Sequence, residues 1–283
     1  MQHRFERPAS IAQAARLLAS GPWAVLAGGT DLYPAHVGRP VAVPLLDITG
    51  IAELRGIRRD DSGWTIGATT TWTDVVRADL PPVLDALKAA AREVGGVQIQ
   101  NTGTVAGNLC NASPAADGTP VLLALDASVV LRSERGERTL PLQRFVLGNR
   151  QTARTADELV VAVCIPARST HARSAFAKLG GRRYLTIAVT TVALVIDCDA
   201  DGTIVASGAA VGSCAAAARR LSTLESRLVG KSVRGDLAAL VDAADLVPLA
   251  PIDDLRASAA YRLDATRTLL GRALRDIARA AGR

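Results

Sequence analysis

The sequence is poor in aromatic residues and in lysine. Aromatic residues make up 3% of the chain, so its core must be built from Ala, Val, Leu and Ile. Lysine occurs at Lys88, Lys178 and Lys231, and the other basic residues are arginines spread among Asp and Glu. The formal charge of +6 therefore does not form the clustered basic stripe that nucleic-acid binding needs. The charge is more consistent with a positive face that contacts an acidic protein partner.

Cysteine and histidine are few and are not grouped. The four cysteines are Cys110, Cys164, Cys198 and Cys214. They form no CxxC pair and lie apart from the histidines, which excludes a zinc or iron–sulfur site made by this chain alone. Buried, unpaired thiols of this kind indicate a reducing compartment, so we expect a cytoplasmic protein. No His–carboxylate or Ser–His arrangement indicates a catalytic acid, base or nucleophile.

Long apolar runs are also missing. The longest, from Ile187 to Ile196, has the length of a buried strand, whereas a membrane helix needs roughly 20 apolar residues. The first residues, Met1 to Arg4, do not begin an apolar run of the kind found in a signal peptide. We therefore expect no membrane segment and no signal peptide.

Short apolar runs alternate with helical patterns along the chain. Helices are expected at Ser10–Ser20, with Ser10 as N-cap, at Leu84–Glu93 and at Pro120–Leu125. The expected strands are Trp23–Leu26, Val41–Ile48, Trp64–Thr71, Ala127–Arg132 and Glu158–Pro166. The stretch from Gln98 to Thr119 is rich in small and polar residues and predicts a loop.

The pattern changes near Arg168, which predicts one domain at residues 1–168 and a second at 169–283. In the second, strands are expected at Ser174–Leu179 and Ala188–Ile196, and the turn Asp199–Gly202 leads into a hairpin strand. A final helix is expected from Asp253 to Ala280. Its apolar face contains Leu255, Ala259, Leu263, Thr266, Leu270, Leu274 and Ile277. This face either packs on the sheet of its own domain or contacts another subunit.

Two adjacent glycines follow the strand Trp23–Leu26, at Gly28 and Gly29. Such a pair allows positive φ and presents successive N–H groups, and Thr30 adds a hydroxyl donor, so the loop suits a phosphate. Its spacing is neither GxGxxG nor GxxxxGK[ST], which excludes the Rossmann and P-loop motifs. A plain tight turn is the alternative.

A second stretch, from Thr104 to Asp117, contains small residues, hydroxyls and amides, which suit a chain that lies close against a polar ligand. A diphosphate would repel the Asp117 carboxylate. Asp117 is therefore expected to accept a hydrogen bond from a ligand hydroxyl or from backbone N–H groups. Its alternative role is the N-cap of the helix near Pro120.

Three motifs in this order resemble the FAD-binding subunits of the xanthine dehydrogenase and carbon monoxide dehydrogenase family. They are LAGGTDL at 26–32, TVAGNLCNASPAAD at 104–117 and AFAKLGGRRYLTIAV at 175–189. The resemblance extends from about Arg4 to Leu274. It implies an α+β fold: an FAD-binding domain of the vanillyl-alcohol-oxidase (PCMH) type made of two α/β subdomains, and a smaller C-terminal α+β domain with an antiparallel sheet and helices.

The resemblance also implies cofactor-binding residues, with no catalytic residue and no metal ligand. The first diphosphate loop would contain Val25, Leu26, Ala27, Gly28, Gly29, Thr30, Asp31 and Leu32. The second would contribute Thr104, Gly107 and Asn108. Asp117 would lie against the sugar-like part of FAD, Val160 near the flavin, and Lys178 in contact with it, where a cation raises the flavin potential. A solvated strand position is the alternative for Lys178.

Three departures from the family pattern concern this site. Ala106 replaces a glycine, so that turn must tolerate a Cβ. Gly118 replaces a hydroxyl residue, which is expected to loosen the loop. Leu185 and Thr186 replace acidic residues in the loop over the flavin, and this difference leaves the electron acceptor open.

The function implied by the resemblance is electron transfer within a multi-subunit molybdenum hydroxylase. Electrons would come from a large subunit with the molybdenum cofactor, through a small [2Fe-2S] subunit, and pass by way of FAD to NAD⁺, oxygen or a quinone. A heterotrimer or a dimer of heterotrimers is expected. One alternative is a stand-alone flavin oxidase, for which Cys110 is the candidate near a cofactor loop for a covalent flavin link. The other is a flavin-binding or assembly subunit without turnover.

Overall fold

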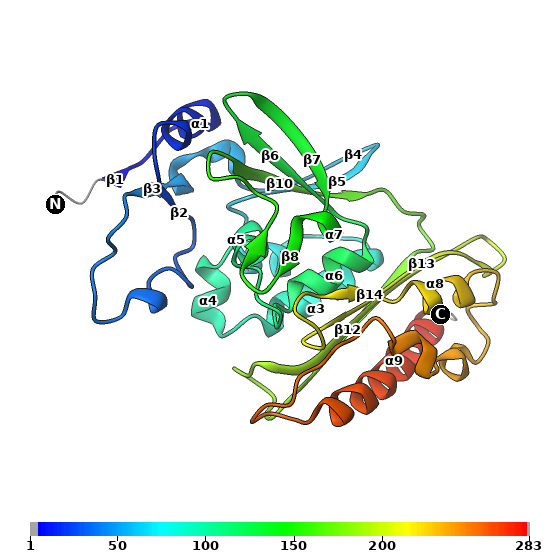
Figure 1. The fold of residues 1–283 in the computed structure, drawn as a ribbon. Coiled ribbons are helices and arrows are strands. Elements are labelled where there is room, and N and C mark those ends of the chain that lie inside the picture. Colours follow the sequence, from blue (N-terminus) through cyan, green and yellow to red (C-terminus); the bar gives the residue numbers. More distant parts are fainter. Residues whose placement is uncertain (1–4, 282–283) are drawn as a thin grey trace.

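A small parallel sheet lies at the N-terminal end of the molecule (Figure 1). The computed structural model describes residues 5–281, so Met1 to Arg4, where no signal peptide is expected, lie outside the described residues. The sheet has the order β1-β3-β2, with β1 (Phe5–Glu6), β2 (Ala24–Leu26) and β3 (Leu45–Asp47). Helix α1 (Ile11–Ala19) joins β1 to β2. Its predicted N-cap is confirmed, because the Ser10 side chain accepts a hydrogen bond from the Gln13 N–H.

A five-stranded antiparallel sheet forms the second layer of the N-terminal part. Its order is β4-β5-β10-β6-β7. The strands are β4 (Ile57–Asp60), β5 (Gly63–Gly67), β6 (Ser128–Ser133), β7 (Gly136–Pro141) and β10 (Leu159–Pro166). Between β7 and β10 lie α7 (Leu142–Phe145), β8 (Val146–Gly148) and β9 (Gln151–Thr152). The strands predicted in these regions are confirmed, although β3 and β5 are shorter than expected.

Five helices connect β5 to β6. They are α2 (Trp72–Arg77), α3 (Asp85–Glu93), α4 (Val97–Thr102), α5 (Val105–Asn111) and α6 (Gly118–Ala124). The prediction of a loop-rich stretch from Gln98 to Thr119 is therefore wrong where α4 and α5 form, and residues 112–117 between α5 and α6 are a loop. Thr104 caps α5 by accepting a hydrogen bond from the Gly107 N–H at 3.0 Å, and the apolar side chains of α5 are buried. Small polar residues form a helix here because a cap and a buried face stabilise it.

Two of the expected departures have a different structural meaning. Ala106 lies inside α5 and is 3% exposed, so its Cβ occupies a helical position that needs no special turn. Gly118 begins α6, where an added Cβ would overlap the ring of Trp72. Gly118 is therefore a site of close packing, and the expectation that it loosens the loop is wrong.

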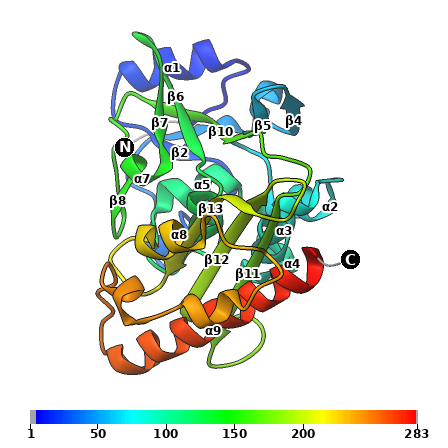
Figure 2. The ribbon, with the colours of Figure 1, turned by 90° about the vertical axis from the view of Figure 1, so that its right-hand side faces the viewer.

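The C-terminal part is built on a four-stranded antiparallel sheet. Its strands, in order, are β11 (Arg173–Gly180), β12 (Ala188–Cys198), β13 (Ile204–Gly212) and β14 (Arg219–Arg220). Every residue of β12 is buried, which confirms the buried strand predicted from its apolar run. Helix α9 (Ala259–Ala281) covers one face of this sheet, and α3 and α6 cover the other (Figures 1 and 2). The short helix α8 (Ser222–Leu228) lies beside β13.

Helix α9 begins six residues later than predicted, at Ala259 instead of Asp253. The Asp254 carboxylate accepts hydrogen bonds from the Arg256 and Ala257 N–H groups, and Asp253 accepts one from Ala259. These side-chain bonds compete with helix formation and hold a turn. Leu255 is consequently 93% exposed and does not belong to the helix face. The buried face packs on β11 and β12 of the same domain, which is the first of the two alternatives.

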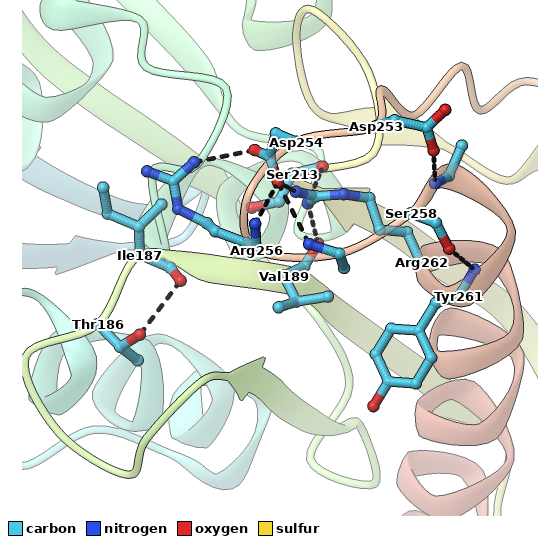
Figure 3. Close-up of polar contacts among 12 residues, drawn as sticks. Thr186, Ile187, Val189, Ser213, Asp253, Asp254, Arg256, Ser258, Tyr261 and Arg262 are labelled. Carbon is cyan, nitrogen blue, oxygen red and sulfur yellow. Dashed lines mark hydrogen bonds and ion pairs between the residues drawn. The ribbon is translucent and has the colours of Figure 1, made fainter.

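A buried arginine fixes the start of α9 to the sheet (Figure 3). Arg262 is 3% exposed, and its Nη1 donates to the Val189 carbonyl at 2.5 Å and to the Ser213 carbonyl at 3.2 Å. Its Nη2 lies 2.7 Å from Asp254 Oδ1. The Arg256 N–H and the Arg262 guanidinium hold the pKa of Asp254 at about 2.

Among residues 5–281, no helix combines the length and apolar character needed to cross a membrane.

Replacing Arg262 should destabilise the fold far more than replacing Arg256. Arg262→Met leaves the Val189 and Ser213 carbonyls without this donor, at a cost of about 1–3 kcal/mol for each buried acceptor. Arg256→Met is the matched control, because Arg256 also binds Asp254 but is exposed. Urea unfolding of both variants gives the comparison, and equal losses would contradict a special role for Arg262.

Candidate functional site

A cavity of about 590 Å³ lies where the loop after β2 meets α5 and the start of α6. Its volume falls within the range of about 300–1,000 Å³ typical of ligand sites. Of the residues predicted from sequence, those lining it are Val25, Leu26, Ala27, Gly28, Gly29, Thr30, Asp31, Leu32, Thr104, Gly107, Asn108, Asp117 and Val160. The fold thus brings two segments that are distant in sequence to opposite walls of one cavity. Lys178 is not among the lining residues, but its side chain forms an ion pair with Asp117, which is one of them.

The glycine pair shapes the first wall. A Cβ on Gly28 would overlap the Thr102 carbonyl oxygen, and Gly29 has a φ of +68°, so neither position accepts another residue without strain. The backbone N–H groups of Gly28, Gly29 and Thr30 make no hydrogen bond to any residue in the described range 5–281. Successive free N–H groups beside a cavity form the kind of nest that binds an anion. The phosphate-binding role of this loop stays a prediction.

The second wall is formed by the N-cap of α5, Thr104, and by Gly107 and Asn108 of the same helix. Thr104 uses its hydroxyl oxygen to cap the helix, so its predicted contact with a ligand would use the hydroxyl hydrogen. The Asn108 Oδ1 atom is buried and has no hydrogen-bond partner among the described residues. A buried polar atom without a partner is costly. Its position on the cavity wall fits a ligand that supplies the missing donor.

Asp117 and Lys178 form a buried ion pair. Lys178 Nζ lies 2.7 Å from Asp117 Oδ2, with the two side chains 6% and 9% exposed, and it also donates to the Glu93 carbonyl at 3.2 Å. Asp117 has helical φ and ψ and makes no side-chain cap bond, so the N-cap alternative is wrong. The solvated position considered for Lys178 is also wrong, because its side chain is buried.

The second carboxylate oxygen of Asp117 is the group most suited to a ligand. Oδ1 is buried and has no partner among the described residues. Burial raises the pKa of Asp117 to about 6, and the attraction of Lys178 opposes this shift. A ligand hydroxyl or N–H at Oδ1 would satisfy this oxygen, which is the role predicted from sequence.

A hydrogen-bond chain links the two walls, and the sequence did not predict it. Asn111 Nδ2 donates to Asp31 Oδ1 at 2.9 Å, and Arg150 Nη1 donates to Asn111 Oδ1 at 2.7 Å. Asn111 lies within the second motif, so its amide was a visible signal. Arg150 lies outside all three motifs, and no local pattern indicated its partner.

The loop between β11 and β12 closes one side of the cavity. Leu185, Thr186 and Ile187 line it, and Arg182 holds the loop by donating to the carbonyls of Tyr184 and Leu185 at 3.0 and 2.7 Å. The absence of acidic side chains at Leu185 and Thr186 therefore affects the cavity wall directly.

Cys110 lies on the cavity wall as well. Cys110 is exposed, so the expectation of a buried thiol is wrong at this position. Within the described residues, no group of three or more His, Cys, Asp or Glu side chains is placed to hold a metal.

Comparison with known proteins gives matches over nearly the whole chain. Residues 1–168 match the family described as the FAD binding domain in molybdopterin dehydrogenase, and residues 174–277 match the CO dehydrogenase flavoprotein C-terminal domain. The chain is 32% identical to the xanthine dehydrogenase FAD-binding subunit of Escherichia coli O157:H7, over 98% of this chain and 97% of that protein. It is 31% identical to the carbon monoxide dehydrogenase medium chain of Hydrogenophaga pseudoflava, over 96% of each. A chain of the CO dehydrogenase structure from Oligotropha carboxidovorans superposes with a TM-score of 0.88, at 28% identity over 98% of both chains.

The ionisation of Asp117 should make the stability of the cofactor-free chain pH-dependent. The folded-state pKa of about 6 exceeds the usual value of 3.8, so the folded state binds a proton more tightly than the unfolded state. The contribution of Asp117 to stability then falls as pH rises from about 4 to about 6. Asp117→Asn does not titrate, so its free energy of unfolding relative to wild type should rise across this window, by an amount on the order of 3 kcal/mol.

Denaturant unfolding of both proteins at several pH values tests this. A relative stability that falls between pH 4 and 6 would show that the attraction of Lys178 exceeds the cost of burial.

Proposed function

The chain belongs to the family of FAD-binding medium subunits of the molybdenum hydroxylases, and from this membership we propose that it passes electrons from iron–sulfur clusters of a partner subunit to NAD⁺, oxygen or a quinone. It is the flavoprotein subunit of a dehydrogenase complex, and its cofactor is FAD. The α+β fold agrees with this family, with an FAD-binding domain and a C-terminal domain of antiparallel sheet and long helix. We keep the division at residues 168 and 169 as part of the proposal.

The observation that carries the proposal is the set of unpaired polar groups around one cavity. Gly28 to Thr30, with their free N–H groups, line the same cavity as Asn108 and Asp117, each of which has a buried oxygen without a partner among the described residues. A ligand that bears both phosphate oxygens and donor groups satisfies both sets. FAD has this combination, since its diphosphate accepts hydrogen bonds and its sugar-like chain and rings donate them.

The residues of this chain would bind and orient the cofactor. When bound, FAD supplies the redox chemistry, and the protein positions it and tunes its electronics. The Gly28–Thr30 nest and the start of α5 would hold the diphosphate, and Asp117 Oδ1 would accept from a cofactor hydroxyl. Lys178 would place a positive charge behind Asp117, partly balanced by that carboxylate, close to the flavin. Val160 would provide an apolar contact.

We propose that the partners are a large subunit with the molybdenum cofactor and a small [2Fe-2S] subunit, in a heterotrimer or a dimer of heterotrimers. The curated relatives support this, because they are named as medium chains or FAD-binding subunits and this chain covers nearly all of their length. A cytoplasmic location belongs to the same proposal and is supported by the free state of all four cysteines. Cys110 lines the cavity, and a stand-alone flavin oxidase stays the alternative.

The purified chain should be yellow and should release FAD, not FMN, on denaturation. Chromatography of the released flavin checks this. Release of FMN alone would contradict the assignment of both cavity walls to a diphosphate.

Expressed without partners, the chain should contain neither molybdenum nor iron and should not oxidise purines or aldehydes. Substrate turnover by the isolated chain would favour the stand-alone oxidase.

Asp117→Asn should weaken FAD binding while the chain still folds. The change places an amide nitrogen at one of the two carboxylate oxygen positions, so either Lys178 or the cofactor loses an acceptor. Hydrogen bonds to charged groups are worth about 1.5–3 kcal/mol, which corresponds to a loss of roughly 10- to 150-fold in affinity. Titration of the cofactor-free variant with FAD measures the loss. Unchanged affinity both in this variant and in Asp117→Ala, which removes both oxygens, would remove Asp117 from the site.

A further inference from the structure

The cavity carries an unusual set of charges for a site that takes a diphosphate. Three carboxylates, Asp31, Asp117 and Glu158, contribute to its lining. Among the described residues that line it, Arg154 is the one cation. A diphosphate carries negative charge and would be repelled by unbalanced carboxylates. Binding therefore depends on how each acidic group is neutralised.

Each carboxylate already has a partner. Glu158 forms a two-pronged ion pair with Arg138, at 2.5 and 2.8 Å, and also accepts from the Thr155 N–H. Asp117 is paired with Lys178, and Asp31 accepts from the Asn111 amide, which Arg150 holds in turn. Arg154 forms no ion pair with any of these three carboxylates, since its hydrogen bonds go to backbone carbonyls.

One nitrogen of the Arg154 guanidinium binds backbone carbonyls, and its other two nitrogens have no partner among the described residues. Nη1 donates to the Glu158 carbonyl at 2.8 Å and to the Thr155 carbonyl at 3.2 Å. Nε and Nη2 make no hydrogen bond to any residue between 5 and 281, and the side chain is half-buried. It lines the same cavity as Cys110 in the last turn of α5.

We propose that Arg154 is a further cofactor-binding residue, whose free N–H groups donate to the diphosphate of FAD. This inference rests on the proposed role of the cavity as the FAD site. A guanidinium is planar and presents parallel N–H groups that match the oxygens of a phosphate. Arg154 then supplies the full positive charge that the neutral N–H groups of the Gly28–Thr30 nest do not provide. It lies outside the three sequence motifs.

The test compares cofactor binding by four forms of the full chain after FAD has been removed: wild type, Arg154→Gln, Arg154→Leu and Arg144→Gln. Arg144 is an exposed arginine of α7 that does not line the cavity, so Arg144→Gln is the matched control. Each form is titrated with FAD and with riboflavin, which lacks phosphate. Both Arg154 variants should bind FAD about 10- to 150-fold more weakly than wild type. Riboflavin affinity should be the same in all four, and the FAD affinity of wild type should fall more steeply with added salt than that of the Arg154 variants.

The outcomes separate the two proposals. If wild type binds FAD and both Arg154 variants match it, the assignment of Arg154 is overturned and the cavity remains the FAD site. An equal loss for riboflavin and FAD would also overturn it, because the contact would then not involve the diphosphate. Failure of wild type to bind FAD would overturn both proposals. Denaturant unfolding of each cofactor-free variant identifies any that does not fold, and Arg154→Leu, which keeps a bulky side chain, decides the question if Arg154→Gln is unfolded.

Discussion

The ion pair between Asp117 and Lys178 connects the two parts of the chain at the wall of the cavity. Asp117 precedes α6, which packs on β12 and β13, and Lys178 projects from β11 and also binds the last carbonyl of α3. Each partner gave up contact with water, a cost of several kcal/mol for each ion that the attraction between them has to offset. The carboxylate still has an unpaired oxygen. The pair therefore adds to the packing of α3 and α6 on the C-terminal sheet, and it leaves a buried oxygen of a cavity-lining residue unsatisfied.

Local pattern was sufficient for the elements that have a clear signal within their own residues. The Ser10 cap, the apolar run of β12 and the hairpin turn at 199–202 specify their own structures, and the structure agrees with the predictions there. Helices α4 and α5 could not be predicted in this way. Their ends are fixed by contacts with distant residues, since the Trp72 N–H binds the Gly103 carbonyl and the Val105 N–H binds the Thr70 carbonyl. At α9 the error came from two aspartates whose carboxylates bind backbone N–H groups before the helix begins.

The candidate site also contains features that the sequence predicted and features that only the folded structure shows. The motifs identified the residues of both walls, because a phosphate-binding loop needs glycine and hydroxyl residues at adjacent positions. The pairing of these residues with one another was not visible, since Asp117 and Lys178 are 61 positions apart and Asp31 and Asn111 are 80 apart. The need for glycine at 28 likewise depends on the carbonyl of Thr102, which only the folded chain brings near. The assignment of each wall residue to a part of FAD is still a prediction.

The β11–β12 loop is anchored at both ends. Lys178 fixes the end of β11 through Asp117, and Val189 fixes the start of β12 through Arg262 and the turn before α9. A segment held this way is restricted at the two points where it joins its strands. Movement on this side of the cavity is then confined to residues 181–187, whose backbone is held mainly by Arg182. The two anchors involve Asp117 of the cavity lining together with Lys178 and Arg262 outside it, and they would thus set how far that side of the cavity can widen.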